Sequence, residues 1–318
     1  MVFLDARTLG DVDNLQLIEA EGRLDIYDDT PQELLLSRCR GKEVIIVNKI
    51  YLGAEILSKL PDLRLICIAA TGINNIDLDY SEKHGIEVMN VAGYSTNSVA
   101  QSTFTTLLYL IGRPAYYDAF VKSGAYENSG CFTHHGRPFQ ELHGKVMGII
   151  GLGAIGKQVA RIATAFGMEL IFHSSSGKNS HPTYRQCTLH EILEEADVLS
   201  IHAPLNAQTK NLICYRELCR MKPGAILINM GRGGIVNETD LARALDEDRI
   251  AAAGIDVLSQ EPVGPNHPLL GLKNPDRIYI SPHMAWASIE SRACLVKKIA
   301  ENIISFKQKS EEAQPLRP

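Results

Sequence analysis

The chain has 318 residues, 45% of them apolar and 22% charged, a composition typical of a globular protein with one large or two ordinary domains. Its formal net charge of −5 argues against nucleic-acid binding, and no apolar run approaches the roughly 18 residues that span a bilayer. The seven cysteines form no CxxC pair and the N-terminus has no signal segment, which disfavours a disulfide framework or zinc site and predicts a cytoplasmic protein that binds no membrane.

Short apolar runs alternate with helical patterns along most of the chain. The runs are rich in Ile, Val and Leu with little polar alternation, which is typical of strands buried on both faces. They lie at Val44–Val47, Leu65–Ala69, Val146–Ile150, Leu170–Phe172, Val198–Ile201, Ala225–Ile228, Ala252–Ile255 and Ile278–Ile280. This alternation predicts an α/β fold with parallel strands and helices on both sides of the sheet.

Three other segments bear on the organisation of the chain. A helix with one long apolar stripe is predicted from Ser98 to Arg113, and we expect it to join or brace two domains. The glycine-rich stretch Ser123–Gly144 shows little apolar periodicity and is, on composition, the best candidate for an internal boundary. The polar tail from Lys307 to Pro318 holds two prolines, so we expect it to be frayed.

A glycine-rich loop, Gly151–Gly156, directly follows the apolar run Val146–Ile150, and an amphipathic helix pattern follows the loop up to Gly167. GxGxxG alone is a weak signal, but this context predicts a dinucleotide-binding loop; the alternative is a plain glycine-rich turn. Gly151 permits the tight turn, Gly153 lets a pyrophosphate approach the backbone, and Gly156 lets helix and strand pack closely. The helix N-terminus then attracts the phosphates.

The end of the next strand bears on which nucleotide binds. NAD sites usually have a carboxylate there to bond the ribose hydroxyls, but here His173, Ser174, Ser175 and Ser176 follow one another, with Lys178 slightly later. Hydroxyl groups can bond a 2′-phosphate and a lysine can pair with it. The sequence therefore favours NADP slightly over NAD, and it leaves open both dual use and a serine-rich turn beside an NAD site.

Three further apolar runs are each followed by a side chain suited to chemistry, namely Arg232, Glu261 and His283. In open α/β sheets, ligands bind at the carboxyl ends of the strands. Arg232, between glycines, is placed to grip a substrate carboxylate with two parallel bonds. Each residue alone is as readily a solvated or loop residue. Together, downstream of a dinucleotide loop, the three indicate an active site.

These motifs resemble the D-2-hydroxyacid dehydrogenase family, which includes glycerate dehydrogenases (hydroxypyruvate and glyoxylate reductases). The resemblance covers nearly the whole chain, and the segments that carry it are Ala70–Asp77, Asn90–Gln101, Gly151–Gly156, Asn229–Gly233, Gly254–Pro262 and Ser281–Trp286. In that family an Arg, a Glu and a His are catalytic, and they fall on Arg232, Glu261 and His283. The serine run after the second strand departs from the Asp of many NAD-using members.

The resemblance implies two doubly wound parallel-sheet domains, with a Rossmann-like nucleotide domain inserted into a flavodoxin-like substrate domain. Residues 1–98 and 287–318 would form the substrate domain and residues 99–286 the dinucleotide-binding domain. The helix from Ser98 would cross between the domains, and nucleotide domains would pair in a homodimer.

The implied reaction is NAD(P)H-dependent reduction of a small 2-oxo acid, hydroxypyruvate or glyoxylate, to the D-2-hydroxy acid, with oxidation of D-glycerate as the reverse. Arg232 would bind the carboxylate and stabilise charge on the carbonyl oxygen. His283 would donate the proton, since imidazole titrates near neutral pH, and Glu261 would bond its other nitrogen and favour the protonated form.

The resemblance also implies further binding residues. Backbone N–H groups of Thr71, Gly72 and Ile73 would complete the grip on the substrate, and Trp286 would narrow the pocket, with simple packing as the alternative. Asp256 would accept a bond from the nicotinamide carboxamide, with a loop cap as the alternative. The remaining cofactor contacts would be Ala154, Ile155, Ala203, Pro204, Thr209, Met230 and Gly231.

Two rival functions stay open. One is a reductase for bulkier 2-oxo acids of the lactate- or phenyllactate-forming type, and the other is a nucleotide-sensing binding protein of the corepressor type. Retention of Arg232, Glu261 and His283 argues against the second. A metal enzyme is disfavoured, because the tight pair His134-His135 would point to opposite faces of an extended chain.

Overall fold

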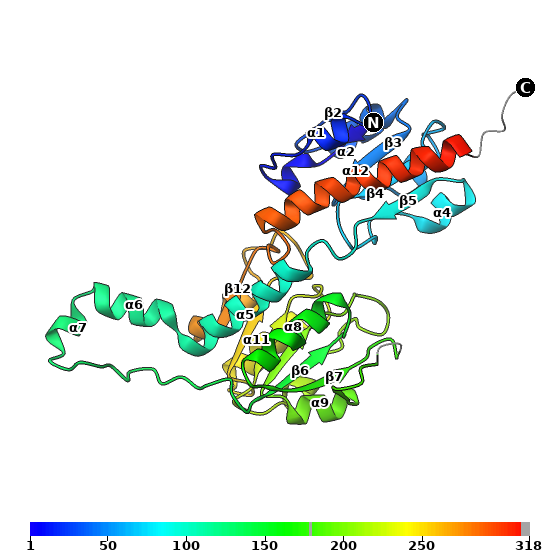
Figure 1. The fold of residues 1–318 in the computed structure, drawn as a ribbon. Helices are drawn as coiled ribbons and strands as arrows, with labels where there is room; N and C mark the ends of the chain where they lie inside the picture. The colour runs from blue at the N-terminus through cyan, green and yellow to red at the C-terminus, as the bar shows by residue number, and fades with distance from the viewer. Residues whose placement is uncertain (178–179, 313–318) are drawn as a thin grey trace, which may run out of the picture. The chain divides into compact units, whose positions relative to one another are not determined.

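A computed structural model describes residues 1–177 and 180–312 of the chain (Figure 1). The chain divides into two compact units. The first unit is Met1–Ser95 with Ala287–Pro318, and the second unit is Thr96–Trp286, inserted between them along the sequence. The glycine-rich stretch Ser123–Gly144 lies inside the second unit, so it marks no boundary between units. None of the helices among the described residues combines the length and the hydrophobicity of a membrane span.

The first unit holds a parallel sheet that has, in the described residues, five strands in the order β2-β1-β3-β4-β5. The strands are β1 (Val2–Phe3), β2 (Asp25–Ile26), β3 (Val44–Val47), β4 (Leu65–Ile68) and β5 (Glu87–Asn90). This is the strand order of a doubly wound, flavodoxin-like sheet. The helices of the unit are η1 (Ala6–Leu9), α1 (Gln16–Glu19), α2 (Gln32–Cys39), α3 (Ala54–Leu57), α4 (Leu78–Lys83) and α12 (Ile289–Glu312).

Helix α12 brings the C-terminal part of the chain back to the first unit, where it packs against α1 and β4. It continues to Glu312, so the prediction of a frayed tail from Lys307 is wrong for residues 307–312. Lys307 Nζ lies 2.9 Å from Glu21 Oε2, and Lys309 Nζ lies 2.8 Å from Glu87 Oε1. An apolar face holds the rest of the helix on the unit; its buried members include Leu295, Val296, Ile299, Ala300 and Ile303.

The second unit holds a parallel sheet that has, among the residues described, seven strands in the order β12-β11-β10-β9-β6-β7-β8. The strands are β6 (Val146–Ile150), β7 (Glu169–His173), β8 (Arg185–Gln186), β9 (Val198–Ile201), β10 (Ile226–Asn229), β11 (Ala252–Ile255) and β12 (Ile278–Ile280). The strand order reverses between β6 and β9, which is the position where ligands bind in open α/β sheets. The predicted parallel sheets are therefore confirmed.

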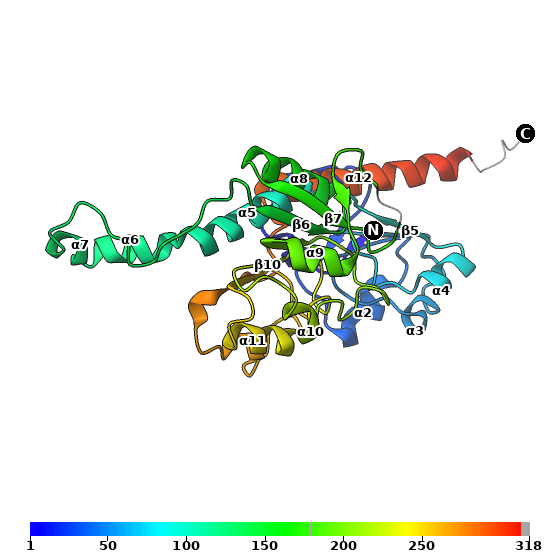
Figure 2. The same cartoon turned by 90° about the horizontal axis from the view of Figure 1, so that it is seen from below.

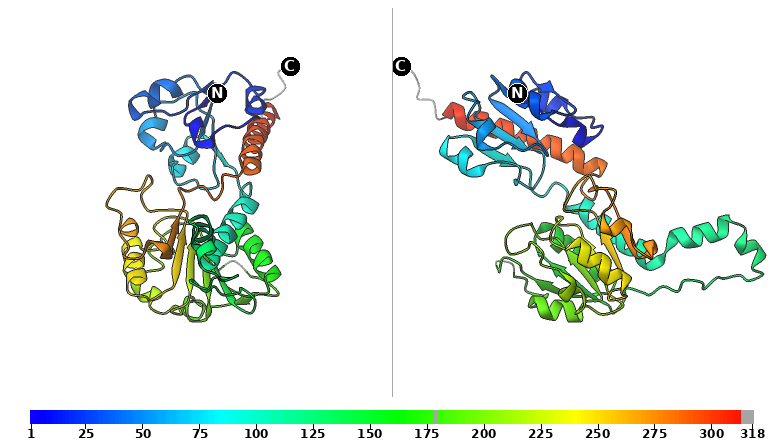
Figure 3. Two further views of the ribbon diagram at one scale, coloured as in Figure 1. Left: turned by 90° about the vertical axis from the view of Figure 1, so that its left-hand side faces the viewer. Right: turned by 180° about the vertical axis from the view of Figure 1, so that it is seen from behind.

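Helices cover both faces of this second sheet (Figure 3). One buried core lies under α5 (Thr96–Gly112) and α8 (Ala154–Ala165), and the other lies under α9 (Leu189–Glu195), α10 (Tyr215–Leu218) and α11 (Glu238–Asp246). Alternate strand residues feed the two cores: Ile149 and Ile228 face the first, whereas Ile150 and Leu227 face the second. Two short helices, η2 (Pro268–Leu270) and η3 (Pro275–Arg277), precede β12.

An arm leaves the sheet of the second unit after α5 (Figure 2). It consists of α6 (Pro114–Lys122), α7 (Ala125–Asn128) and the return segment 129–141. Neither helix has a buried residue, and Phe132 in the return segment is 90% exposed. Tyr116 Oη lies 2.7 Å from His134 Nε2 and ties the two limbs of the arm together.

Candidate active site

The loop between β6 and α8 has the geometry of a phosphate-binding turn. Gly151 has φ +92°, and a Cβ added there would lie 2.8 Å from the backbone nitrogen of Ala203. A Cβ on Gly156 would lie 2.3 Å from the carbonyl oxygen of Gly151, whereas one on Gly153 would meet no atom within 4 Å. The first and third glycines are therefore required by packing, and the second leaves the backbone open to a ligand. The first helical bond runs from Lys157 N to Gly153 O, so the N–H groups of residues 154–156 are available to phosphate oxygens.

The end of β7 presents the serine run. His173 Nδ1 lies 3.1 Å from Cys187 O, and Gly177 N donates to Ser174 O at 3.1 Å, which closes a turn. Ser174 is buried, Ser175 is half-buried and Ser176 is exposed. Lys178 lies outside the described residues.

The end of β9 lies beside the glycine loop. Ala203 lies against two glycine turns, the one at Gly151 and the one at Gly231. A Cβ on Gly231 would lie 2.8 Å from Ala203 O. Thr209 is buried and donates its hydroxyl to Pro204 O at 2.7 Å, so it shapes this loop from within. His202 Nε2 lies 2.8 Å from Ser200 Oγ, and burial lowers the pKa of His202 to about 3. The ring is therefore neutral at physiological pH.

The turn after β10 carries Arg232. Asn229 organises it from both sides, since its Nδ2 donates to Arg232 O at 3.0 Å and its Oδ1 accepts from Gly231 N at 3.1 Å. A Cβ on Gly233 would lie 2.0 Å from the carbonyl carbon of Leu258, so this turn is in direct contact with the loop that follows β11. The half-buried Arg232 therefore stands on a fixed turn at the carboxyl edge of the sheet.

Glu261 and His283 meet although they follow different strands. His283 Nδ1 lies 2.7 Å from Glu261 Oε2, and Leu258 N donates to Glu261 Oε1 at 2.9 Å. A carboxylate only accepts hydrogen bonds, so Nδ1 carries a proton and Nε2 is the nitrogen that can exchange one. The side chains of Glu261 and His283 are 33% and 21% exposed, which leaves the pair accessible to a small ligand.

Asp256, directly after β11, is 2% exposed and holds the loop that carries His283. Its carboxylate accepts bonds from the Ser281 hydroxyl at 2.6 Å and from the N–H groups of Met284 at 2.9 Å and Ala285 at 3.0 Å. Its own carbonyl oxygen accepts a bond from His283 N at 2.8 Å. The contacts of Asp256 in this structure are those of a loop cap, and its bond to a carboxamide stays a prediction.

The remaining predicted substrate residues fall in different units. Thr71, Gly72 and Ile73 follow β4 in the first unit, where Thr71 Oγ1 donates to Val91 O at 3.0 Å. Trp286 is the last residue of the second unit and packs, half-buried, against the core under α5 and α8. In the described ranges, no group of three or more His, Cys, Asp or Glu side chains is arranged to hold a metal ion.

One group beside the site was not predicted from the sequence. Glu238, Ser259 and His267 form a hydrogen-bonded cluster. Ser259 belongs to the segment after β11 that also contains Glu261, which we call the Glu261 loop. Glu238 and Ser259 are 21 residues apart, and Glu238 and His267 are 29 apart. An acid in the first turn of a helix is common, so the only sequence signal was weak.

A parallel sheet with a glycine-rich phosphate turn at its switch point is typical of proteins that bind a dinucleotide. Residues 104–285 match the family model described as "D-isomer specific 2-hydroxyacid dehydrogenase, NAD binding domain". The chain belongs to the D-2-hydroxyacid dehydrogenase family, so it is an NAD(P)-binding oxidoreductase and the predicted family is confirmed.

Three similar proteins illustrate the relationship. A glyoxylate reductase of Aeropyrum pernix is 39% identical over 296 residues, covering 89% of this chain and 85% of the relative. A hydroxypyruvate reductase of Blautia hydrogenotrophica is 35% identical and covers 96% of both chains. The solved structure of an NADPH-dependent glyoxylate/hydroxypyruvate reductase from Sinorhizobium meliloti, in complex with NADP and malonate, has a TM-score of 0.82 at 25% identity and covers 100% of this chain and 95% of that one.

Proposed function

We propose that this protein reduces a small 2-oxo acid, hydroxypyruvate or glyoxylate, to the D-2-hydroxy acid with NAD(P)H, and oxidises D-glycerate in reverse. The observation that carries the proposal is the Glu261–His283 pair, bonded at 2.7 Å at the same sheet edge as the Arg232 turn. The names of the glyoxylate and hydroxypyruvate reductases that the chain resembles support this substrate class.

The loop Gly151–Gly156 would hold the pyrophosphate of the nucleotide, because Gly153 is open and the N-terminus of α8 offers N–H groups. Bound there, the reduced nicotinamide would supply the hydride. Arg232 binds the substrate carboxylate and places its positive charge where the carbonyl oxygen becomes negative, which stabilises the transition state more than the ground state.

His283 acts as the proton donor. Glu261 holds Nδ1, so the imidazolium presents its Nε2 proton to the carbonyl oxygen, and the neutral ring accepts that proton in the reverse direction. The bond to Glu261 also fixes the orientation of the ring. Thr71, Gly72, Ile73 and Trp286 are proposed to bind the substrate and limit its size, while Ala203, Pro204, Met230 and Gly231 border the nucleotide.

We further propose that the enzyme prefers NADP slightly over NAD. The support is the serine run that stands where a carboxylate would repel a 2′-phosphate, with Ser175 and Ser176 accessible at the end of β7. His173 and Ser174 form the start of this segment, and Lys178 remains part of the proposal from its sequence position alone.

Steady-state kinetics with hydroxypyruvate, glyoxylate, pyruvate and phenylpyruvate, each with NADPH and NADH, tests the proposal. We expect kcat/KM to be highest with hydroxypyruvate, then with glyoxylate, and moderately higher with NADPH than with NADH. A higher kcat/KM with phenylpyruvate would favour the reductase for bulkier acids, and binding of nucleotide without turnover would favour a sensing protein. The variant Arg232→Lys keeps the charge but loses the planar fork, so we expect KM to rise and kcat to fall together.

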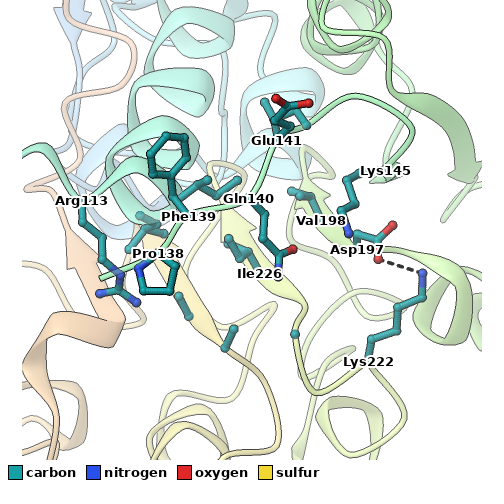
Figure 4. A pocket seen from close by; sticks show the side chains of 16 residues that line it. Arg113, Pro138, Phe139, Gln140, Glu141, Lys145, Asp197, Val198, Lys222 and Ile226 are labelled. Atoms are coloured by element: carbon teal, nitrogen blue, oxygen red, sulfur yellow. Dashed lines mark hydrogen bonds and ion pairs between the residues drawn. The ribbon is translucent and has the colours of Figure 1, made fainter. Parts of the chain in front are cut away.

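We also propose that two copies of the chain pair through their second units. The arm leaves large apolar side chains exposed, with Phe132 90% and Phe139 64% exposed, and exposed apolar surface of this kind is typical of a protein–protein contact. A pocket of about 350 Å³ lies at the root of the arm, by the amino ends of β9, β10 and β11 (Figure 4). Leu110, Val198 and Ile226 form its apolar wall. In a twofold dimer the arm of each copy would cover the root of the other.

Light scattering on the eluting peak of a size-exclusion column tests the dimer. We expect the mass of two copies for the wild type and a shift towards one copy for Phe132→Glu. The control is Leu34→Glu, which places the same charge on an exposed apolar position of α2 in the first unit. A wild type with the mass of one copy would contradict the proposal.

A further inference from the structure

A second acid–histidine pair is bonded to the Glu261 loop through Ser259. Glu238, the first residue of α11, lies with its Oε2 2.8 Å from His267 Nε2, and both side chains are only 10% exposed. The same carboxylate accepts two bonds from Ser259, one from its N–H and one from its hydroxyl, each at 2.6 Å. We call Glu238, Ser259 and His267 the Glu238 cluster.

The chemistry of the cluster makes the carboxylate hard to replace. His267 Nδ1 accepts a bond from Leu269 N at 3.4 Å, so the ring proton stands on Nε2 and is donated to Glu238. Glu238, whose own side chain is 10% exposed, therefore receives three donors, two of them from the exposed Ser259. An amide at this position could not accept all three bonds, because its NH₂ group only donates.

The role of Glu238 is not helix capping. Asn237 already caps α11, since its Oδ1 accepts a bond from Asp240 N at 3.0 Å. The carboxylate of Glu238 instead reaches from α11 to Ser259, two residues before Glu261. An acid that only complemented the helix dipole would need no such partners.

The cluster joins the two loops that carry the proposed chemistry. Arg232 stands on the turn that leads from β10 into α11, and Gly233 of that turn is in contact with Leu258. Leu258 N in turn donates to the Glu261 carboxylate, whose other oxygen bonds His283. The Glu238–Ser259 bonds thus tie the Glu261 loop to the start of α11, into which the Arg232 turn leads.

We infer that the Glu238 cluster positions Glu261 against His283, and so acts in the reaction through that pair without touching the substrate. This inference rests on the proposed function, in which Glu261 orients the proton donor. It assigns to Glu238, Ser259 and His267 a task in catalysis that goes beyond stabilising the fold.

The test compares Glu238→Gln with Glu261→Gln, and with Glu247→Gln as a matched control at the other end of α11, where Glu247 pairs with Arg243. We expect Glu238→Gln to lower kcat by about 10- to 100-fold, the usual loss when a group that orients a reacting side chain is removed, with the KM for NADPH unchanged within about twofold. Its pH–rate profile for reduction should shift towards acid, as that of Glu261→Gln should. Glu247→Gln should keep the wild-type kcat and profile.

Two further variants keep the test decisive: a double variant, and a single variant that removes only one bond of the cluster. Because Glu238 is inferred to act through Glu261, the double variant Glu238→Gln/Glu261→Gln should lose less activity than the product of the two single losses. Ser259→Ala, which removes only the hydroxyl bond, should shift the profile in the same direction by a smaller amount and serves if Glu238→Gln does not fold.

Four results would overturn the inference. One is that Glu238→Gln and Ser259→Ala lower only the unfolding temperature and keep the wild-type kcat and profile, and another is that the losses in the double variant multiply. If Glu261→Gln shifts the profile and Glu238→Gln does not, the positioning role fails and the proposed function stands. If Glu261→Gln itself leaves the profile unchanged in an active enzyme, the role of Glu261 fails and this inference fails with it.

Discussion

Asp5 in the first unit and Asp256 in the second do the same local work in two different sheets. Each lies just beyond a strand, is 2% exposed, and accepts hydrogen bonds from the loop after the neighbouring strand. The donors to Asp5 are the N–H groups of Asn48, Lys49 and Ile50, and those to Asp256 are Met284 N, Ala285 N and the Ser281 hydroxyl. In each unit, a buried carboxylate thus fixes a loop at a strand end.

The two loops differ in what stands on them. The loop held by Asp256 carries His283 at φ +52°, with its ring bonded to the Glu261 carboxylate. The loop held by Asp5 is bonded back to its own unit, since Asn75 Nδ2 donates to Ile50 O at 3.0 Å and Asn48 Nδ2 donates to Thr8 Oγ1 at 2.9 Å. The architecture supplies rigidity in both units, and the proposed chemistry depends on the side chains placed on one of them.

The largest effect is expected where the loop of the second unit loses its proposed proton donor. His283→Ala should lower kcat by about two to four orders of magnitude, the usual contribution of a positioned acid. Nucleotide binding, measured by fluorescence titration with NADPH, should survive because the phosphate loop is unchanged. Near-wild-type turnover in this variant would show that His283 is not the donor.

The two carboxylates can be compared directly by Asp256→Asn and Asp5→Asn. Both variants lose acceptors of buried N–H groups, so each should lower the free energy of unfolding by about 1–3 kcal/mol. Only Asp256→Asn should also lower kcat, by about tenfold or more, because its loop carries His283. Urea unfolding and steady-state kinetics measure the two effects. Equal kcat values in the two variants would mean that the comparison between the loops is mistaken, and a raised KM for NADPH in Asp256→Asn alone would support a carboxamide contact.

His202 gives a stability effect confined to the second unit. Its pKa in the folded chain is about 3, below the ordinary 6.5, so the unfolded chain binds a proton that the folded chain does not as the pH falls below 6.5. The free energy of unfolding should therefore decrease by about 2 kcal/mol between pH 7 and pH 5 on account of this residue. His202→Asn should remove that part of the pH dependence. Urea unfolding at both pH values checks it, and parallel curves for variant and wild type would refute it.

The smallest effect concerns nucleotide choice at the end of β7. Ser174→Asp should lower the NADPH:NADH ratio of kcat/KM by at least about tenfold, since one lost phosphate bond of about 1.4 kcal/mol gives that factor and repulsion adds to it. Ser58→Asp, on an exposed turn of the first unit, serves as the control. A wild type that strongly prefers NADH, with a ratio unaffected by Ser174→Asp, would mean that this segment does not contact the 2′ position.

Local sequence patterns predicted most strands of the two sheets. Contacts between residues that are far apart in the sequence could not be predicted in this way. Runs such as Val44–Val47 and Val198–Ile201 are wholly buried strands, so an unbroken apolar pattern found them. β1 and β8 have two residues each, and β5 is half-exposed with Glu87 and Asn90 in it, so no such pattern exists there. The prediction of a frayed tail is wrong for residues 307–312, because the polar composition of this segment gives no sign of the ion pair between Lys307 and Glu21.

The residues of the candidate site also divide into those that local sequence patterns predict and those that they do not. The loop Gly151–Gly156 could be recognised because its requirements are local to one turn and its helix. Arg232, Glu261 and His283 could be recognised because each follows an apolar run. The Glu238 cluster could not, because its members are 21 and 29 residues apart in the sequence and meet only through tertiary packing.

The insertion of the second unit into the first has a consequence for how the protein is made. Helix α12 packs on α1 and β4, yet the 191 residues of Thr96–Trp286 lie between them in the sequence. At about 5–20 residues per second, a ribosome needs about 10–40 s to cross that interval. Residues 1–95 emerge before the second unit, but α12, which packs on them, is translated only after the second unit is complete. In the nascent chain, the face of the five-stranded sheet that α12 covers therefore stays exposed until the second unit has been translated.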